Sequence, residues 1–358
     1  MTDYGLAGKV NTHKEILIVA LSAGISILYF LLTFGGKSSN VISYFVHMAV
    51  VGFLFLILYW IWLKCKATIR KRHNTVLALT VFIVLCILCV FDRVYWLPHA
   101  SYFLFPVLLP GFIDHISQRF GKDRDIHFLL TIGMVCLGSL LFAWVVLGAG
   151  YDKYPSLRYA LCPAIFFLSI SDIAICDWWK KQEMSGKRHI LLLAVLTLNN
   201  AVGIGWSLLH NQRYFQIISG LLNGTFDDWK LYRLSVMEAF FHRDIAPLEA
   251  MYPHEQYWMP IESDTLASIY IHYGWIPVCI LVTLLLAVVC LLIDMSREVR
   301  LNIVRYLAIG YVIRMILCLF ATVNLLVYEG MIFPFTRIGS PEVIFLGIIM
   351  SEVRRERI

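Results

Sequence analysis

Charged residues are scarce in this sequence. Asp, Glu, Lys and Arg make up 15% of its 358 residues, whereas hydrophobic residues make up 59%. A soluble domain of this length needs far less apolar surface, so the composition excludes an ordinary soluble fold. The period-two alternation typical of a membrane β-barrel is also missing, because the apolar residues form continuous runs. The composition therefore predicts a membrane protein built of helices.

Several motifs of soluble enzymes are absent too. There is no HExxH, Walker or G-x-S-x-G motif, and no cluster of histidines, so no metal site is predicted. None of the nine cysteines lies in the long polar stretch at 211–262, which argues against a disulfide framework there. Cys86 and Cys89 have redox spacing but lie within an apolar run, and we interpret them as apolar side chains. Basic residues are scattered over short loops, so no nucleic-acid partner is predicted.

What the sequence does contain is a series of about ten apolar runs, most of them near the twenty residues that a helix needs to cross a bilayer. They fall at 16–35, 42–63, 75–97, 102–116, 128–149, 158–176, 190–210, 264–293, 303–328 and 336–351. The fourth is short and contains Pro106 and Pro110, so we expect it to be kinked or only partly inserted. The predicted fold is all-α and polytopic, with about ten transmembrane helices in a single domain over residues 1–358.

Basic residues fix the orientation of these spans, because they follow every even-numbered run. They are Lys64, Lys66, Arg70, Lys71 and Arg72; Arg119, Lys122 and Arg124; Lys180, Lys181, Lys187 and Arg188; Arg297 and Arg300; and Arg354, Arg355 and Arg357. Loops rich in Lys and Arg stay on the cytoplasmic side. The prediction is a multi-pass protein of the inner (plasma) membrane with both termini cytoplasmic. The net charge of +6 favours contact with anionic membrane lipids.

The same topology places the polar stretch 211–262 outside, as a large loop between spans seven and eight. Residues 229–241 have apolar side chains at helical spacing, preceded by Asp227 and Asp228 as caps. We expect a short amphipathic helix along the outer membrane face. Arg233 on this helix would lie near the depth of lipid phosphates, which makes it a candidate substrate-binding residue.

Two carboxylates, Glu262 and Asp264, stand where the loop ends and the eighth apolar run begins. A partly desolvated carboxylate at the membrane boundary can act as a general base, and a mixed set of acidic and basic groups can hold a sugar or a diphosphate. The alternative is structural, with Ser263 or Asp264 serving as the N-cap of the helix of span eight.

Ionisable residues within the spans are costly to bury, so each needs a partner or a function. Arg93, at the outer end of span three, is either a boundary residue or a substrate contact. Asp172 in span six is expected to be structural. Arg314 lies deep in span nine and should face the interior of the helix bundle. Three charged residues of the last segment are expected to pair with one another: Glu329, Arg337 and Glu342.

Two stretches resemble the SEDS family (shape, elongation, division and sporulation proteins, such as RodA and FtsW). Residues 258–274, W-M-P-I-E-S-D-T-L-A-S-I-Y-I-H-Y-G, are similar to the family segment L-P-E-x-H-T-D-F-I-F-x-x-x-x-E-E-x-G. Residues 330–341, G-M-I-F-P-F-T-R-I-G-S-P, are similar to the closing motif G-I-P-L-P-F-x-S-Y-G-G-S-S, which a final helix and a basic tail follow. The family also has ten spans and its largest outer loop between spans seven and eight. The Glu and Lys that the family has at the start of span four are missing near 97–101, which indicates a divergent member.

The resemblance implies a peptidoglycan glycosyltransferase that polymerises a polyprenyl-diphosphate-linked precursor at the outer membrane face. Asp264 matches the catalytic aspartate of the family and would deprotonate a sugar hydroxyl for attack on the donor. Glu262 and Arg93 would contact the substrate, and Arg233, Arg337 or a bound Mg²⁺ would stabilise the charge on the leaving diphosphate. A single-span penicillin-binding transpeptidase is the partner that the family implies.

The sequence is also compatible with two other functions. An O-antigen-type polymerase or ligase also combines many spans with one large outer loop. A non-catalytic scaffold or transporter of the cell envelope is favoured by the missing Glu and Lys of span four.

Overall fold

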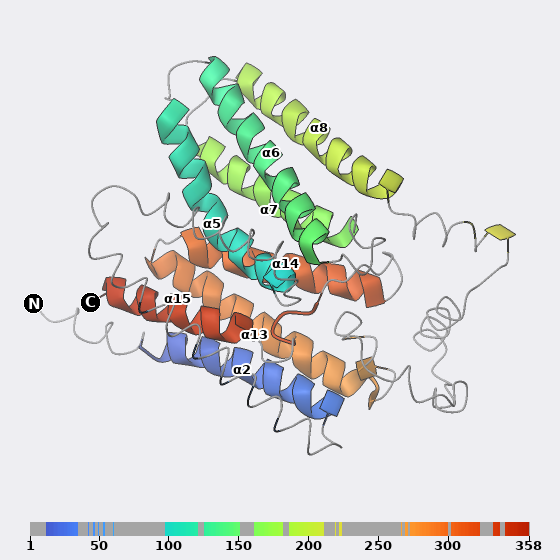
Figure 1. Cartoon of the computed structure of the whole chain (residues 1–358). Coiled ribbons are helices and arrows are strands. Elements are labelled where there is room, and N and C mark those ends of the chain that lie inside the picture. Colours follow the sequence, from blue (N-terminus) through green and yellow to red (C-terminus); the bar gives the residue numbers. More distant parts are fainter. Residues whose placement is uncertain are drawn as a thin grey trace, which may run out of the picture. The chain divides into compact units, whose positions relative to one another are not determined.

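The computed structural model describes residues 12–34, 97–120, 125–150, 161–181, 186–210, 273–299, 302–322, 332–336 and 341–357, with single positions at 42, 46, 49, 53, 60, 219, 222, 223, 266, 269 and 270. Eight long helices account for almost all of these residues, and the described part of the chain contains no strand (Figure 1). The prediction of an all-α architecture is confirmed for this part. The chain divides into two compact units, which are described separately.

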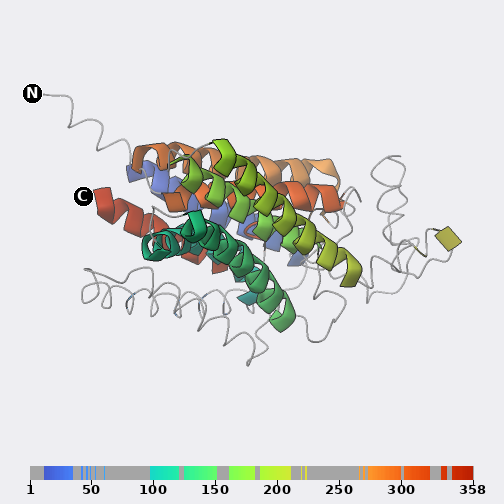
Figure 2. The same cartoon turned by 90° about the horizontal axis from the view of Figure 1, so that it is seen from above.

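Unit 1 spans Met1–Arg70, Ala239–Thr322 and Ile332–Ile358. Its helices are α2 (Thr12–Phe34), α13 (Trp275–Val299), α14 (Asn302–Thr322) and α15 (Pro341–Arg357). Helix α13 packs against α2 and α14, and α15 packs against α2. The beginning of α2 and the end of α15 lie at the same end of this bundle (Figures 1 and 2). The predicted location of both termini on one side of the membrane fits this arrangement.

Helical periodicity explains how α13 is buried. Its fully buried side chains recur every three or four residues and form a single stripe: Leu281, Leu285, Val288, Leu292 and Met295. The opposite face is apolar as well, and Ile276 is 74% exposed. A helix that is apolar on both its packed and its exposed faces is suited to lipid rather than to water.

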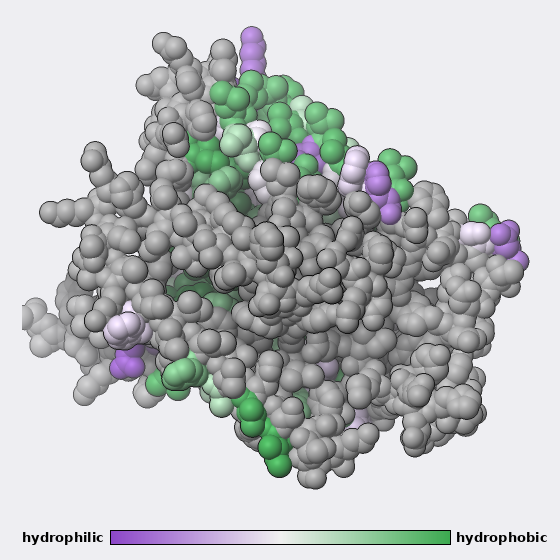
Figure 3. All heavy atoms as spheres, in the orientation of Figure 1, coloured by the Kyte–Doolittle hydropathy of each residue, from purple (hydrophilic) through white to green (hydrophobic). Residues whose placement is uncertain are grey.

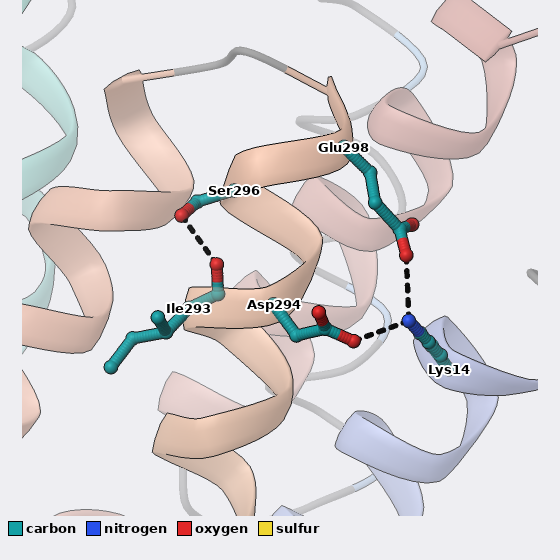
Figure 4. Close-up of polar contacts among 5 residues, drawn as sticks. All are labelled: Lys14, Ile293, Asp294, Ser296 and Glu298. Carbon is teal, nitrogen blue, oxygen red and sulfur yellow. Dashed lines mark hydrogen bonds and ion pairs between the residues drawn. The ribbon is translucent and has the colours of Figure 1, made fainter.

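A cluster of charges joins two helix ends of unit 1 (Figure 4). The Lys14 ammonium at the start of α2 lies between two carboxylates near the end of α13: it donates to Asp294, and to Glu298 Oε1 at 2.6 Å. The topology predicts that the start of span one and the end of span eight lie on the same membrane face. This contact agrees with that relative placement.

Unit 2 spans Lys71–Glu238 and Val323–Met331. Its helices are α5 (Leu97–Phe120), α6 (Asp125–Gly150), α7 (Leu161–Lys180) and α8 (Gly186–His210). Helices α6 and α7 each pack against the other three helices, so together they form the centre of the unit. Phe167 on α7 meets Tyr102 of α5 with ring centroids 5.6 Å apart and Phe105 of α5 at 4.9 Å, which ties these two helices together.

Helix α8 lies at the edge of unit 2 and buries only a narrow stripe. The buried side chains are Leu192, Leu196, Asn199, Gly203 and Ser207. Most of the remaining surface is apolar and exposed, for example Leu193 and Leu209, and Figure 3 shows this hydrophobic surface over α8. The small residues of the stripe allow close approach of the neighbouring helices, as is common between helices in membranes.

Five helices, α2, α7, α8, α13 and α14, are long and apolar enough to cross a membrane, and shorter apolar stretches lie in α5, α6 and α15. We conclude that the chain is membrane-embedded. The fourth predicted span is a helix of 24 residues that contains Pro106 and Pro110, with its apolar part at Tyr102–Ile113. The runs 42–63 and 75–97, the loop 211–262 and the amphipathic helix 229–241 lie almost wholly outside the described residues. Ten spans and a single domain therefore stay predictions.

Candidate functional site

One segment of unit 1 departs from the helical pattern although it is buried. Residues Ile332–Thr336 are non-helical, contain a turn, and precede α15. All five are buried, and Phe333 and Phe335 are each 1% exposed. Non-helical backbone at membrane depth exposes polar groups that helices satisfy internally, so it needs partners from elsewhere in the protein. We refer to Ile332–Thr336 as the buried turn.

Arg314 of α14 supplies the first partner. Its side chain is 1% exposed. Its Nη2 donates to the carbonyl oxygen of Ile332 at 2.7 Å, and its Nη1 donates to Glu342 Oε1 at 2.5 Å. A charged guanidinium is stabilised in the interior only with an opposite charge and with acceptors for its other protons. The sequence prediction that Arg314 faces the bundle interior is confirmed.

Glu342, the second residue of α15, supplies the other partner. Its Oε2 accepts the backbone N–H of Phe335 at 3.0 Å, so one carboxylate holds both the arginine and the turn. Of the trio predicted to pair, Glu329, Arg337 and Glu342, only Glu342 is described, and it pairs with Arg314. Glu329 and Arg337 lie outside the described residues. Sequence reasoning missed this pair because its members are 28 positions apart, although a buried arginine alone signals that a carboxylate must lie nearby.

Two further contacts hold the buried turn. The hydroxyl of Thr336 donates to the carbonyl oxygen of Phe333 at 2.8 Å. Phe335 has a φ of 64°, a left-handed conformation that costs a non-glycine residue energy and is held only by its surroundings. Its ring packs on Tyr311, one turn before Arg314, with centroids 4.8 Å apart. The turn is therefore fixed by charge, by backbone hydrogen bonds and by aromatic packing together.

The buried turn packs against the middle of α14, a helix long and apolar enough to cross a membrane. Arg314 is eight residues before the end of α14 at Thr322, which corresponds to about 12 Å along the helix axis. Discontinuous backbone at such depth is found where it is covered by protein or lines a substrate cavity. Arg314 and Glu342 are engaged in holding this turn.

The second unusual position is Gly274, where the eighth apolar run is divided. Gly274 has a φ of 75°, and its N–H donates to the carbonyl oxygen of Tyr270 at 2.8 Å. This is the geometry with which a glycine ends a helical turn. Helix α13 then begins at Trp275. Ser263 and Asp264 lie outside the described residues, so their alternative role as a helix N-cap stays a prediction.

The residues before Gly274 are anchored in unit 1. Leu266, Ile269 and Tyr270 are buried, and the Tyr273 hydroxyl donates to the carbonyl oxygen of Leu32, near the end of α2, at 2.6 Å. In the sequence, Asp264 stands two residues before Leu266. The segment that follows the predicted base is thus fixed to the same unit as the buried turn.

The five residues predicted to form the site cannot be compared with one another, since all lie outside the described residues. They are Arg93, Arg233, Glu262, Asp264 and Arg337. A divalent cation such as Mg²⁺ would need oxygen ligands and would neutralise charge on a diphosphate. Glu262 and Asp264 have the chemistry of such ligands, and within the described ranges no three His, Cys, Asp or Glu side chains are grouped to hold a metal.

Comparison with known proteins adds no assignment: no protein-family model matches the chain, and no curated protein matches it significantly.

Proposed function

We propose that the chain is a membrane-embedded glycosyltransferase, similar to the SEDS proteins, that polymerises a polyprenyl-diphosphate-linked glycan at the outer membrane face. The observation that carries this proposal is the buried turn Ile332–Thr336 held by Arg314 and Glu342. It forms part of one of the two stretches that carry the family resemblance. The described residues of the other stretch, Leu266, Ile269, Tyr270, Tyr273 and Gly274, belong to the same unit.

In the proposed reaction, the Asp264 carboxylate takes the proton of an acceptor sugar hydroxyl. The hydroxyl oxygen attacks the anomeric carbon of the donor, and the bond from that carbon to the diphosphate oxygen breaks. Polyprenyl diphosphate leaves with the bonding electrons, and the configuration at the anomeric carbon is inverted. Arg337 and Arg233 would stabilise the charge on the leaving diphosphate, and Arg93 and Glu262 would contact the sugars.

The buried turn gives this scheme a physical basis for positioning Arg337. A cation can lower the energy of a transition state only if it is held where charge develops, without reorganisation during the reaction. Arg337 directly follows Thr336 in the sequence, and the turn before it is fixed by an ion pair and two backbone hydrogen bonds. The Arg314–Glu342 pair is therefore assigned a positioning role, not a catalytic one.

The test is polymerisation by the purified protein of a lipid-linked disaccharide, the lipid-linked peptidoglycan precursor. Native protein should form polymer, and Asp264→Asn should lower the rate by at least about 100-fold, which is the scale of general-base catalysis. Asp228→Asn, a carboxylate of the same outer loop predicted to be a helix cap, is the matched control and should retain activity. Equal rates for native protein and Asp264→Asn would reject Asp264 as the base.

The buried turn also favours one competing function, because discontinuous segments at membrane depth form the substrate sites of many transporters. A transporter would move a lipid-linked glycan or another solute across liposomes without forming polymer. Absence of polymer together with measurable transport would replace the transferase proposal. Polymer from a lipid-linked O-antigen repeat, but not from the disaccharide precursor, would identify the substrate as an O-antigen repeat. The proposed transfer reaction would be unchanged.

A further inference from the structure

Unit 2 contains a second polar cluster that the proposed transferase does not use. Asp172 of α7 lies eight residues before Lys180, about 12 Å from that end of the helix. Asn200 of α8 lies ten residues before His210, about 15 Å from that end. Both positions are in the middle of helices long and apolar enough to cross a membrane. Asn200 Nδ2 donates to Asp172 Oδ2 at 2.6 Å.

Three polar atoms of this cluster are buried with no hydrogen-bond partner: Asp172 Oδ1, Asn200 Oδ1 and Asn199 Nδ2. The whole Asn199 side chain is nine-tenths buried, with 8% exposed. An unsatisfied buried polar atom destabilises the folded state, so three in one place call for a physical explanation. Ordered water or a bound ligand supplies the missing bonds at such sites.

Helix register places these residues at one level of unit 2. A side chain added at Gly203 of α8 would meet Leu140 of α6 and Leu168 of α7, so these three positions adjoin. Asn199 of α8, Cys136 of α6 and Asp172 of α7 each lie one turn from these positions, all in the same direction in space. Asp172 and Cys136 are also close enough to interact electrostatically. Asn199 therefore faces the junction of α6 and α7 at the level of the Asp172 carboxylate.

The charge of Asp172 is not neutralised by a basic side chain within the described part of unit 2, and Asn200 is its hydrogen-bond partner. The titratable groups near it are the thiols of Cys136 on α6 and Cys176 on α7. A bare carboxylate at this depth is costly, and such residues in membrane helices are commonly sites for protons or ions. Both unpartnered oxygens are acceptors, which suits a ligand of positive charge.

We propose that Asp172, Asn199 and Asn200 form an intramembrane site for a single monovalent cation, either a proton or an alkali-metal ion. The Asp172 carboxylate would carry the compensating negative charge, and the Asn200 amide oxygen would orient toward the cation. The Asn199 amide would hold a water or the far carboxylate oxygen. This site uses none of the residues proposed for glycosyl transfer and would make the stability of the α6–α7–α8 packing depend on pH or on the alkali-metal ion.

The test is thermal unfolding of the full-length protein in detergent at two pH values, each with sodium chloride or with choline chloride at the same ionic strength. A ligand that binds only the folded state raises the unfolding temperature, by several degrees at about 100 times its dissociation constant. If sodium is bound, the unfolding temperature rises in sodium over choline. If a proton is bound, it falls as the pH is raised, in both salts.

Asp172→Asn should abolish the dependence that the native protein shows, and Asn199→Ala should weaken it. Asp177→Asn on the same helix, near its end, is the matched control and should retain it. The proposal is overturned if the native protein responds to neither sodium nor pH, or if Asp172→Asn responds as the native protein does.

A second measurement does not depend on the folding of a variant. A hydrophobic carbodiimide, which reacts with protonated carboxyl groups inside membranes, should label Asp172 of the native protein, as read by mass spectrometry of its peptides. A proton site predicts less labelling at higher pH, and an alkali-metal site predicts protection by sodium over choline. Labelling of Asp172 that is insensitive to both would overturn the proposal.

Discussion

The two units solve the problem of polar groups in an apolar interior in different ways. In unit 1, Arg314 and Glu342 neutralise each other, and one further nitrogen of Arg314 (Nη2) and one further oxygen of Glu342 (Oε2) hold the backbone of the buried turn. In unit 2, Asp172 has an amide partner, and three polar atoms around it are without hydrogen bonds. The helices of unit 2 are uninterrupted there. The first cluster therefore builds structure, whereas the unsatisfied atoms of the second are the basis of the cation site that we propose.

The largest effect is expected from removing one charge of the Arg314–Glu342 pair. Arg314→Leu leaves the Glu342 carboxylate buried without its cation and frees the carbonyl of Ile332. Such a change should destabilise the protein by about 3–5 kcal/mol, seen as a large fall in the unfolding temperature in detergent. Arg305→Leu, an exposed arginine of the same helix, should have little effect.

The double variant Arg314→Leu with Glu342→Leu sharpens the same test. Because no unpaired charge is left, its stability should lie well above that of Arg314→Leu alone. The N–H of Phe335 and the carbonyl of Ile332 still lose their partners, so the double variant should not reach the native value. If both variants were equally destabilised, the ion pair would not be coupled and the assigned structural role would be wrong.

The next largest effect is expected from disturbing the packing between the helices of unit 2. A Cβ atom at Gly203 would lie 2.8 Å from a methyl carbon of Leu140 and 2.9 Å from one of Leu168. Gly203→Val therefore overpacks the junction of α6, α7 and α8, and we expect a loss of about 1–3 kcal/mol in thermal unfolding. Gly205→Val is the matched control on the same helix, because nothing lies within 4 Å of its Cβ. An equal loss in both variants would point to helix propensity and not to packing.

Backbone conformation provides a smaller effect in unit 1. Gly274 has a positive φ, so Gly274→Ala should lower the stability by about 1–2 kcal/mol. Gly347→Ala, within α15 with open space around its Cβ, should instead raise it by up to about 1 kcal/mol, since alanine favours the helix. Opposite signs in the unfolding temperature would confirm the left-handed turn, whereas a stabilising Gly274→Ala would contradict it.

The sequence predicts much of the architecture, because transmembrane helices are read from the length and apolarity of single runs. The runs at 16–35, 128–149 and 190–210 correspond to α2, α6 and α8 within four residues. The break at Gly274 was not predicted. Hydropathy is continuous across it, and the conformation of one glycine depends on tertiary contacts such as that between Tyr273 and Leu32.

The polar clusters were predicted only in part, for a related reason. A charge within an apolar run can be read from the sequence, so the burial of Arg314 was expected. Its partner could not be chosen by proximity in the chain, since Arg337 is a closer neighbour of Glu342 than Arg314 is. The same limit applies to Asp172, whose partner Asn200 lies 28 positions away on another helix. Pairing between helices is set by their register, which a single sequence does not encode locally.

The smallest expected effect concerns the charged residues where the start of α2 meets the end of α13. Lys14 lies between Asp294 and Glu298, but all three are partly exposed and screened by water and salt. Lys14→Met should lower the unfolding temperature only slightly, and raising the salt concentration should remove the difference. Exchanging the charges, with Lys14→Asp and Asp294→Lys together, should recover more stability than either single change. Recovery would confirm that the start of α2 and the end of α13 meet. Additive losses would show that these two ends do not meet. The prediction that they lie on the same side of the membrane would then lose the support of this contact.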